Sequence, residues 1–406
     1  MSQNGRLINT TYTSEGYVAS ITTPEGTVSY TYDDFGRQLS VSDGTDTTSY
    51  TYDSVGRLAT VTSQAGATTY SYDVFGNLAK TTTTTSANAK LTTTYEYDSM
   101  NRLTRLTNFA DANNNGVMDD GEGVSQFDYT LNSLGNKTHA TETFWFDNYE
   151  DGVKDTNVNS IDWTYDAQNR LIQEVFDHYD DDFDQTLDWT YDNVGNRMSQ
   201  NLDKGNDGIF DEITSYAYDV NDRLLSEITG GKSTVYGYDH TQQTAKTVNE
   251  NGAITSDTTF EYNAQGRMTV VTITSYTDGV ASRIEKTIYS YGLDGIRVSA
   301  LHEIDTNADG AYDTATLTEY LNDPNNHTGY SQVLKTTEFF FGGETRTVTK
   351  EIYYTIGLDQ ISQSVTNFVD GIAQETEHHY FTYDGHGSTR TLLDATAVCV
   401  HRFSWC

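Results

Sequence analysis

Hydrophobic and polar residues alternate along most of the chain in short runs that end in similar residues. In YTYDSVGRL, which begins at Tyr50, the two tyrosines stand two positions apart, and LATVTS alternates again after the turn. Side chains two positions apart lie on one face of a β-strand. The alternation therefore predicts a β-hairpin whose first strand carries an aromatic face that is buried.

The same unit recurs along nearly the whole chain. Its frame is Tyr, Asp, two variable residues, Gly or Asn, Arg or Asn, and then usually Leu or Met. We expect the Asp to start a turn by bonding the backbone and the Gly to close it at positive φ. Clear copies begin at Tyr32, Tyr52, Tyr72, Tyr97, Tyr165, Tyr191, Tyr218 and Tyr262, with looser copies at Tyr12, Tyr129, Tyr238, Tyr291 and Tyr383.

Stacking of these hairpins predicts an all-β fold. One hairpin cannot hide its aromatic face, whereas neighbouring hairpins in an array can. We expect one long antiparallel sheet that curves or spirals, because twist accumulates with strand number. The repeated Tyr, Gly and Arg are then structural. Strands are expected around residues 30–32, 50–52, 70–72, 163–165 and 189–191, with the acidic connections outside them.

The composition indicates a folded protein and excludes some classes of binding partner. The 406 residues include 30 Tyr, 16 Phe and 4 Trp, which supply large apolar surfaces. The formal net charge of −35 argues against nucleic acid and anionic lipid as partners, because both would be repelled. No apolar run is long enough to predict a membrane span.

Four connections share a second motif, with Asp first, an acidic or amide residue fifth, Gly sixth and Asp ninth. Calcium takes several oxygen ligands from a loop that a glycine allows to turn sharply, so we predict calcium loops. The predicted ligands are Asp111, Asn113, Asn115, the Val117 carbonyl, Asp119 and Glu122 in the first loop; Asp147, Asp151 and Asp155 in the second; Asp203, Asp207 and Asp211 in the third; and Asp305, Asn307, Asp309 and Asp313 in the fourth.

The first of these loops differs from the other three. It alone places a glutamate, Glu122, at the twelfth position, as EF-hand loops do, whereas the others are closer to dockerin-like or thrombospondin-type loops. The flanking residues indicate strands, so no EF-hand helices are expected. The alternative interpretation is that these Asp, Asn and Gly residues form turns without a metal. Four loops with one frame in so acidic a chain favour calcium.

No motif for catalysis is present: GxSxG, HExxH, P-loop and dinucleotide fingerprints are all missing. His378 and His379 are adjacent on an expected strand, so their side chains should point to opposite faces and share no metal. Near the C-terminus, Cys399, His401 and Cys406 supply three of the four ligands of a structural zinc site, and no fourth is visible. We therefore expect that the chain is not an enzyme and holds no zinc.

The YDxxGRL units resemble the YD repeats of the RHS-repeat family, which includes bacterial Rhs proteins, wall-associated proteins, teneurins and shell-forming subunits of Tc toxins. GLDQISQSV from Gly357 and YDGHGSTRTLLDATA from Tyr383 also resemble the segment near the end of the RHS core. The resemblance implies a ribbon of strands wound into a spiral or partial β-shell. It divides the chain into a repeat array with loop insertions, 1–356, and a core-like segment, 357–406.

The second segment departs from polymorphic-toxin members of that family. Their core ends in a DPxG-type motif followed by a toxin domain, whereas the DP of this chain, Asp323 and Pro324, lies in NDPNN. Residues 357–406 are therefore expected to be a truncated core segment. The opening MSQNGRLINTTYTSEG lacks the basic and then apolar layout of a signal peptide, so export would need another route or a missing N-terminal segment.

Together these patterns predict a non-catalytic structural or interaction scaffold of an exported or cell-surface bacterial protein, stiffened by calcium. Two alternatives stay open. One is a carbohydrate-binding adhesin module, because exposed Tyr and Trp rings can stack on sugars; the other is a fragment of a toxin-encapsulating shell. The expected partner is thus a surface protein or carbohydrate, or an enclosed toxin.

Overall fold

A computed structural model describes residues 2–3, 6–147, 153–342 and 345–403 of the chain. The described residues form strands, apart from one 3-10 helix, η1 (Asp181–Phe183). The all-β prediction is confirmed. The first half of the chain contains β1 (Ser2–Gln3), β2 (Arg6–Leu7), β3 (Asn9–Tyr12), β4 (Val18–Thr23), β5 (Gly26–Tyr32), β6 (Gln38–Ser42), β7 (Thr47–Tyr52), β8 (Leu58–Ser63), β9 (Gly66–Tyr72), β10 (Leu78–Thr85), β11 (Lys90–Tyr97), β12 (Leu103–Ala110), β13 (Gly123–Leu131), β14 (Lys137–Phe146), β15 (Asp155–Tyr165), β16 (Leu171–Asp177) and β17 (Gln185–Tyr191).

The second half of the chain continues the same sheet. From β18 to β30 each strand pairs antiparallel with the strands before and after it, as the stacked-hairpin prediction requires, and the sheet continues from β30 to β32, β33 and β34, with β31 paired only to β30. The second half contains β18 (Arg197–Lys204), β19 (Glu212–Tyr218), β20 (Leu224–Thr229), β21 (Lys232–Asp239), β22 (Gln242–Glu250), β23 (Ala253–Tyr262), β24 (Met268–Thr277), β25 (Val280–Tyr291), β26 (Arg297–Asp305), β27 (Thr314–Asp323), β28 (Gln332–Gly342), β29 (Thr345–Ile356), β30 (Gln360–Val369), β31 (Ile372–Ala373), β32 (Glu377–Tyr383), β33 (Thr389–Leu393) and β34 (Cys399–Arg402).

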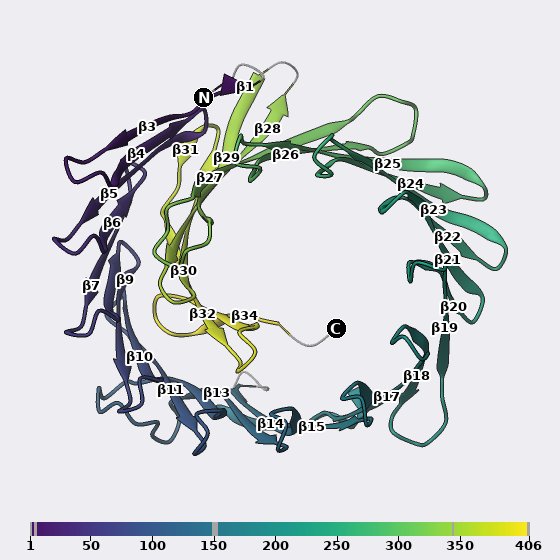
Figure 1. Ribbon diagram of the computed structural model, residues 1–406, viewed down its shortest axis with the longest axis horizontal. Coiled ribbons are helices and arrows are strands. Elements are labelled where there is room, and N and C mark those ends of the chain that lie inside the picture. Colours follow the sequence, from purple (N-terminus) through teal and green to yellow (C-terminus); the bar gives the residue numbers. More distant parts are fainter. Residues whose placement is uncertain (1, 4–5, 148–152, 343–344, 404–406) are drawn as a thin grey trace.

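The sheet is open and wound into a spiral. Within the described residues, β3 pairs only with β4 and β34 pairs only with β33, so the sheet has two free edges. Figure 1 shows the ribbon passing once around and then continuing inside its own beginning, so that β27 to β34 lie within the turn formed by β3 to β13. The predicted curved or spiralling sheet is confirmed, and the overlap gives the molecule a double-layered side.

The connections between strands alternate between the two ends of the strands, as in any up-and-down sheet. The Tyr-Asp turns, such as residues 33–37 between β5 and β6, lie at one end, which we call the YD rim. The acidic connections, such as residues 306–313 between β26 and β27, lie at the other end, which we call the acidic rim. The two sequence motifs are therefore segregated in space.

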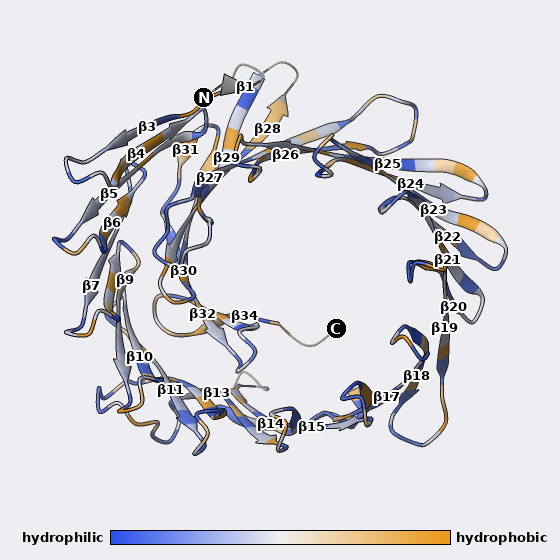
Figure 2. Ribbon diagram, viewed as in Figure 1, coloured by the Kyte–Doolittle hydropathy of each residue, from blue (hydrophilic) through white to orange (hydrophobic). Residues whose placement is uncertain are grey.

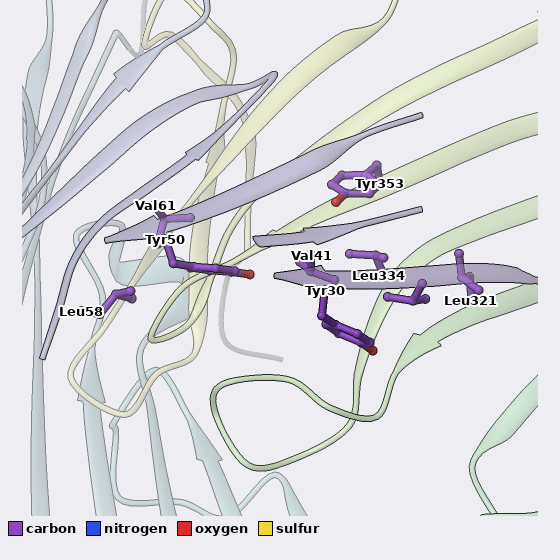
Figure 3. Close-up of a cluster of buried hydrophobic side chains, with 9 residues drawn as sticks. Tyr30, Val41, Tyr50, Leu58, Val61, Leu321, Leu334 and Tyr353 are labelled. Carbon is purple, nitrogen blue, oxygen red and sulfur yellow. The ribbon is translucent and has the colours of Figure 1, made fainter. Parts of the chain in front are cut away.

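The hydrophobic core lies between the two layers. One cluster joins Val28, Tyr30, Val41 and Tyr50 of the outer layer to inner-layer side chains that include Tyr353. Figure 3 shows Tyr30, Val41 and Tyr50 on the side that faces Tyr353. A second cluster forms under the end of the chain: Leu106, Phe127, Tyr129, Ala140 and Ile161. The aromatic face of the repeat is thus buried where a second layer covers it.

The rest of the spiral is a single layer. Between Ile161 and Val298, where every residue is described, no hydrophobic side chain is buried. The aromatic residues of the repeat, such as Trp189 and Tyr216, are only half-buried there. In Figure 2 hydrophobic and hydrophilic residues share the strands all round the spiral. The prediction of a buried aromatic face is wrong for this arc, because no second layer covers it.

The repeated frame also links each hairpin to the next. The Asp53 carboxylate accepts hydrogen bonds from the backbone N–H groups of Val55 and Arg57, at 3.0 and 2.8 Å, and from the Arg57 guanidinium. The Arg57 guanidinium lies 4.2 Å from the ring centre of Tyr72 in the next hairpin. The Tyr72 hydroxyl donates to the Leu58 carbonyl at 2.9 Å. The turn residues therefore connect successive hairpins through side-chain contacts.

Candidate functional site

Three acidic loops share one hydrogen-bond pattern at their first aspartate. The Asp305 carboxylate accepts hydrogen bonds from the backbone N–H groups of Asp309 and Gly310, at 3.3 and 2.8 Å. The Asp111 and Asp203 carboxylates accept the equivalent pairs, at 3.0 and 2.9 Å and at 3.2 and 2.8 Å. All three aspartates are buried, with 3%, 4% and 1% of Asp111, Asp203 and Asp305 exposed. The first aspartate therefore anchors each loop through two backbone hydrogen bonds to its buried carboxylate.

The glycine at the sixth position allows this pattern. Gly116, Gly208 and Gly310 adopt φ values of 75°, 84° and 92°, a region that side chains disfavour. The backbone turns back over the first aspartate at this point, so that two successive N–H groups point at its carboxylate. The sharp turn that the sequence motif predicts is present in all three loops.

The last acidic residue of each loop closes it onto the second residue. The Asp313 carboxylate accepts a hydrogen bond from the Thr306 backbone N–H at 2.7 Å, and Asp211 accepts the equivalent bond in its own loop at 2.7 Å. In the longer first loop Glu122 takes this role, since its Oε1 accepts from the Ala112 N–H at 2.9 Å. The twelfth-position glutamate therefore replaces the ninth-position aspartate.

The amide side chains predicted as ligands lie nearer the surface than the buried first aspartate. In the first loop the side-chain amides of Asn113 and Asn115 donate to Asp119 Oδ2 at 2.6 and 2.7 Å. In the fourth loop the Asn307 amide donates to Asp309 Oδ2 at 3.2 Å. These side chains are exposed, so each loop brings several hard oxygen atoms together at the surface.

The other predicted ligands are placed less closely. Val117 is 61% exposed. Asp207 is exposed, and its Oδ1 accepts from the Ile209 N–H at 2.9 Å. Asp151 lies outside the described residues, while Asp147 follows β14 and Asp155 begins β15. Contrary to expectation, Asp155, Asp203 and Asp305 belong to strand ends instead of lying outside the strands.

The donor set of these loops suits a hard cation. Across the described ranges, no three His, Cys, Asp or Glu side chains gather as a metal site would need. Calcium also accepts amide and backbone carbonyl oxygens, and the loops combine a buried carboxylate with exposed amide and carboxylate oxygens. The residues present therefore fit calcium better than a soft metal, and calcium binding stays a prediction.

A groove of about 630 Å³ opens at the YD rim, where the two layers meet. Tyr17, Tyr32 and Tyr52 line it from the outer layer, and Asn325 and His327 line it from the inner layer. The rings of Tyr17 and Tyr32 stack with centres 5.1 Å apart, and the Asn325 amide donates to the Tyr32 hydroxyl at 2.7 Å. Aromatic walls beside amide and imidazole groups can hold a small polar ligand.

One buried ion-pair cluster fastens the end of the chain to the outer layer. The Arg390 guanidinium binds the Glu142 carboxylate through two contacts, at 3.1 and 2.7 Å, and contacts Asp384 at 3.2 Å. All three side chains are buried. Beside them, burial lowers the pKa of Lys137 to about 8. Sequence analysis missed Glu142, because nothing in its local pattern marks a partner 248 residues away.

A second buried polar cluster, centred on Asp323, joins the outer and inner layers. The Tyr30 hydroxyl donates to Asp323 at 2.7 Å, and the Asn326 amide donates to the other carboxylate oxygen at 3.0 Å. Burial raises the pKa of Asp323, whereas burial lowers the pKa of the nearby His327. The DP dipeptide that departs from the RHS core motif is thus part of a structural contact.

The histidines and cysteines singled out in the sequence do not gather. His378 Nδ1 lies 2.8 Å from the Ser364 hydroxyl, and its neighbour His379 follows it on β32. Cys399 is an exposed free thiol on β34, and Cys406 lies outside the described residues. Among the residues that the structure covers, no helix has the length and apolar character needed to cross a membrane.

Comparison with known proteins gives one family match and several similar structures. No curated protein matches the chain. The structure of TcdB2-TccC3-TEV is 14% identical with a TM-score of 0.32, over 98% of this chain and 25% of that chain. A Photorhabdus luminescens Tc holotoxin pore is 13% identical with a TM-score of 0.29, over 99% of this chain and 26% of that chain. A porin-like protein from Bacteroides uniformis is 12% identical with a TM-score of 0.29, over 60% and 95%.

This chain therefore spans about a quarter of the length of the first two chains. The family match is local and falls on the repeat. The family described as RHS Repeat matches residues 52–90, which contain the turns that begin at Asp53 and Asp73 and the strands from β8 to β10. This segment of the chain is similar to the RHS Repeat family.

Proposed function

We propose that the chain is a non-catalytic scaffold of an exported or cell-surface protein, built as an RHS-type strand spiral and stiffened by calcium at its acidic rim. The RHS match at residues 52–90 and the hairpin-to-hairpin contacts of the repeated turn support the scaffold. The observation that carries the calcium proposal is the shared geometry of the loops at Asp111, Asp203 and Asp305.

The physical reason for calcium lies in where these carboxylates sit. A buried carboxylate is costly unless it is paired, and backbone N–H groups neutralise it only in part. A cation held between the buried carboxylate and the exposed oxygens above it would offset the repulsion within each loop. Because the cation binds the folded loop and not the unfolded chain, it would stabilise the fold by mass action.

Thermal unfolding with calcium and with chelator tests this proposal. Calcium is expected to raise the melting temperature of the wild-type chain, and the double variant Asp111→Asn and Glu122→Gln is expected to lose part of that rise and one bound ion. Asp53→Asn is a matched control, because it removes a carboxylate from the YD rim and Asn132 occupies the same turn position elsewhere. A melting temperature indifferent to calcium would show that the loops are only turns.

The tyrosine groove at the YD rim favours carbohydrate binding as a second candidate function. Tyr17 is 37% exposed and stacks on Tyr32, so a sugar ring could pack on this wall while Asn325 and His327 bind its hydroxyls. Screening on a glycan array tests this candidate, with Tyr17→Ala as the variant that should lose binding. Binding that survives Tyr17→Ala, or no binding to any glycan, would show that the groove is not a carbohydrate-binding site.

Enclosure of a cargo is a third candidate, favoured by the uncovered aromatic face of the single layer. Trp189 and Tyr216 are half-buried there, at the repeat position that the second layer covers elsewhere. Reading the coding sequence beyond codon 406 tests it, since a DPxG-type motif followed by a toxin domain is the expected result. A stop codon at that point would count against this candidate.

A further inference from the structure

A row of exposed hydrophobic side chains lies along the YD rim, outside every site described above. The residue just before the closing Gly or Asn of each turn points away from the sheet. In the five successive turns from residue 33 to residue 136 this residue is hydrophobic and exposed: Phe35 83%, Val55 72%, Phe75 77%, Met100 58% and Leu134 75%. Single exposed hydrophobic residues are ordinary, but five at one position of a repeat form a patch.

The row is continuous only on the double-layered side of the spiral. In the turns of the single-layered arc the same position carries Gln168, Val194, Asn221 and Gln265, of which only Val194, 73% exposed, is hydrophobic, so the turn itself does not require a hydrophobic residue. The inner layer adds Tyr330, 77% exposed, and Leu358, 43% exposed, on loops at the same rim. The apolar side chains therefore gather where the rim is two sheets thick.

In three of the five turns of the row the aspartate is paired with the arginine four residues on, whereas Asp73 accepts from the Asn77 amide. Asp33 and Arg37 contact at 2.6 Å, and Asp98 and Arg102 also contact at 2.6 Å. The acidic loops that give the chain much of its formal charge of −35 lie at the acidic rim instead. A second molecule of like charge would be repelled by the acidic rim and much less by the YD rim.

The dimensions of the row suit a specific contact. Each hairpin contributes two strands at roughly 4.8 Å, so neighbouring tips are about 10 Å apart and five tips span about 40 Å. Two sheets packed about 10 Å apart make the rim about 20 Å wide. The resulting patch is on the order of 800 Å² for each partner, the size of a standard protein interface.

We propose that the YD rim of the double-layered side is a self-association surface, on which a second copy of this chain docks rim to rim. A two-fold axis through the Phe75 turn superposes the row on itself, so that Phe35 of one copy meets Leu134 of the other. The two spirals then stack with their acidic rims at opposite ends.

This contact goes beyond the proposed scaffold function and depends on neither calcium nor a ligand. An anionic membrane as the occupant is disfavoured by the charge of −35. Because the two copies repel each other overall, screening by salt should strengthen the dimer. Salt dependence therefore distinguishes this contact from one that rests on ion pairs, which salt would weaken.

Sedimentation velocity of the full chain at low and high salt tests the proposal. The wild type is expected to be a dimer at micromolar concentration, with tighter association in 0.5 M than in about 0.05 M sodium chloride. The variant Phe35→Gln, Phe75→Gln and Met100→Gln is expected to raise the dimer dissociation constant at least tenfold. Gln168 shows that this turn accepts glutamine, and Val55→Gln with Leu134→Gln is a second variant if the first does not fold.

A matched control changes three exposed hydrophobic residues at the acidic rim. Val280→Gln, Val369→Gln and Ile372→Gln alter side chains that are 69%, 58% and 67% exposed, and association should be unchanged. A wild type that is monomeric at both salts overturns the proposal, and so does a rim variant that dimerises like the wild type. A monomer that binds phosphatidylcholine vesicles through the same side chains would assign the patch to a lipid surface instead.

Discussion

At the residue scale, aspartate has three distinct roles in this chain, and its surroundings decide which. In the turns, as at Asp98, the carboxylate is partly exposed and paired with the arginine four residues on. In the acidic loops, as at Asp305, it is buried and bound by backbone N–H groups. At Asp323 it is buried beside a tyrosine hydroxyl, and its pKa is raised. The same residue type thus caps turns, anchors loops and joins layers.

Removal of the buried guanidinium should be far more costly than removal of an exposed one. Arg390→Ala removes the guanidinium that contacts the buried carboxylates of Glu142 and Asp384, so we expect a loss of about 3–5 kcal/mol in the free energy of unfolding. Arg346→Ala is the control, because Arg346 also holds a carboxylate, Glu319, through two contacts but is exposed. Its expected loss is below about 1 kcal/mol. Chemical denaturation measures both, and equal losses would contradict the role of burial.

The turn aspartates should make the fold sensitive to acid. The hydrogen bond from the Arg102 guanidinium, and then those from backbone N–H groups, hold the pKa of Asp98 below its ordinary value. A lowered folded pKa stabilises the fold above the unfolded pKa, and this stabilisation disappears as the pH falls through the folded pKa. The pKa values of the equivalent turn aspartates are lowered too: Asp33, Asp53, Asp166 and Asp219.

A variant with Asn at all five turn positions tests this pH dependence. It should lose less stability than the wild type between pH 5 and about pH 3, which melting temperatures across that range would show. The variant is expected to fold, because Asn263 already accepts the Gln265 and Arg267 backbone N–H groups in its own turn. Parallel pH profiles for the two proteins would mean that other carboxylates control acid unfolding.

At the element scale, the hairpin turn depends on one backbone conformation. Gly56 has φ of +90° and no atom crowds its Cβ position except Arg37 at 3.7 Å, so conformation alone limits substitution there. Gly56→Asn should cost less than about 1 kcal/mol, since Asn101 occupies the equivalent position at φ of 60°. Gly56→Val should cost about 2 kcal/mol or more, because a β-branched side chain resists positive φ.

The control for this prediction is Ser54→Val, which adds the same side chain to the same turn at negative φ. It should change the free energy of unfolding by less than about 0.5 kcal/mol, as exposed substitutions usually do. Urea denaturation of Gly56→Asn, Gly56→Val and Ser54→Val measures the free energy of unfolding of each variant. If Gly56→Val and Ser54→Val prove equally costly, hydrophobic exposure explains the effect and the turn conformation does not.

The local sequence pattern predicted the hairpins, but it did not predict which other parts of the chain they contact. Period-two alternation and a repeat of about twenty residues suffice to place strands such as β5, β7 and β9 and the turns that follow them. The calcium motif likewise predicted the sharp turns at Gly208 and Gly310. The role of Arg57 was missed, because its contact with Tyr72 belongs to the next hairpin and not to its own.

At the scale of the whole molecule, the overlap of the spiral could not be predicted, since it joins residues far apart in the chain. Tyr30 and Asp323 are separated by 293 residues, and no local pattern pairs them. The overlap nevertheless decides where the core lies, because the same aromatic face is buried under a second layer and half-exposed without one. The spiral is therefore a sheet whose stability varies around its circumference.

Hydrogen exchange should reveal this variation directly. Local openings cost least where few apolar contacts are buried, so the backbone amides of β17 to β22 should exchange at least tenfold faster than those of β5 to β9. Both sets lie in antiparallel pairs with similar registers, each interrupted by one shift beside the YD rim, so burial is the main difference between them. Arg390→Ala supplies the internal control, because it should speed exchange in β13 and β14 and leave β20 to β22 unchanged. Uniform protection around the spiral would instead mean that the sheet opens as one cooperative unit and that the second layer adds no local stability.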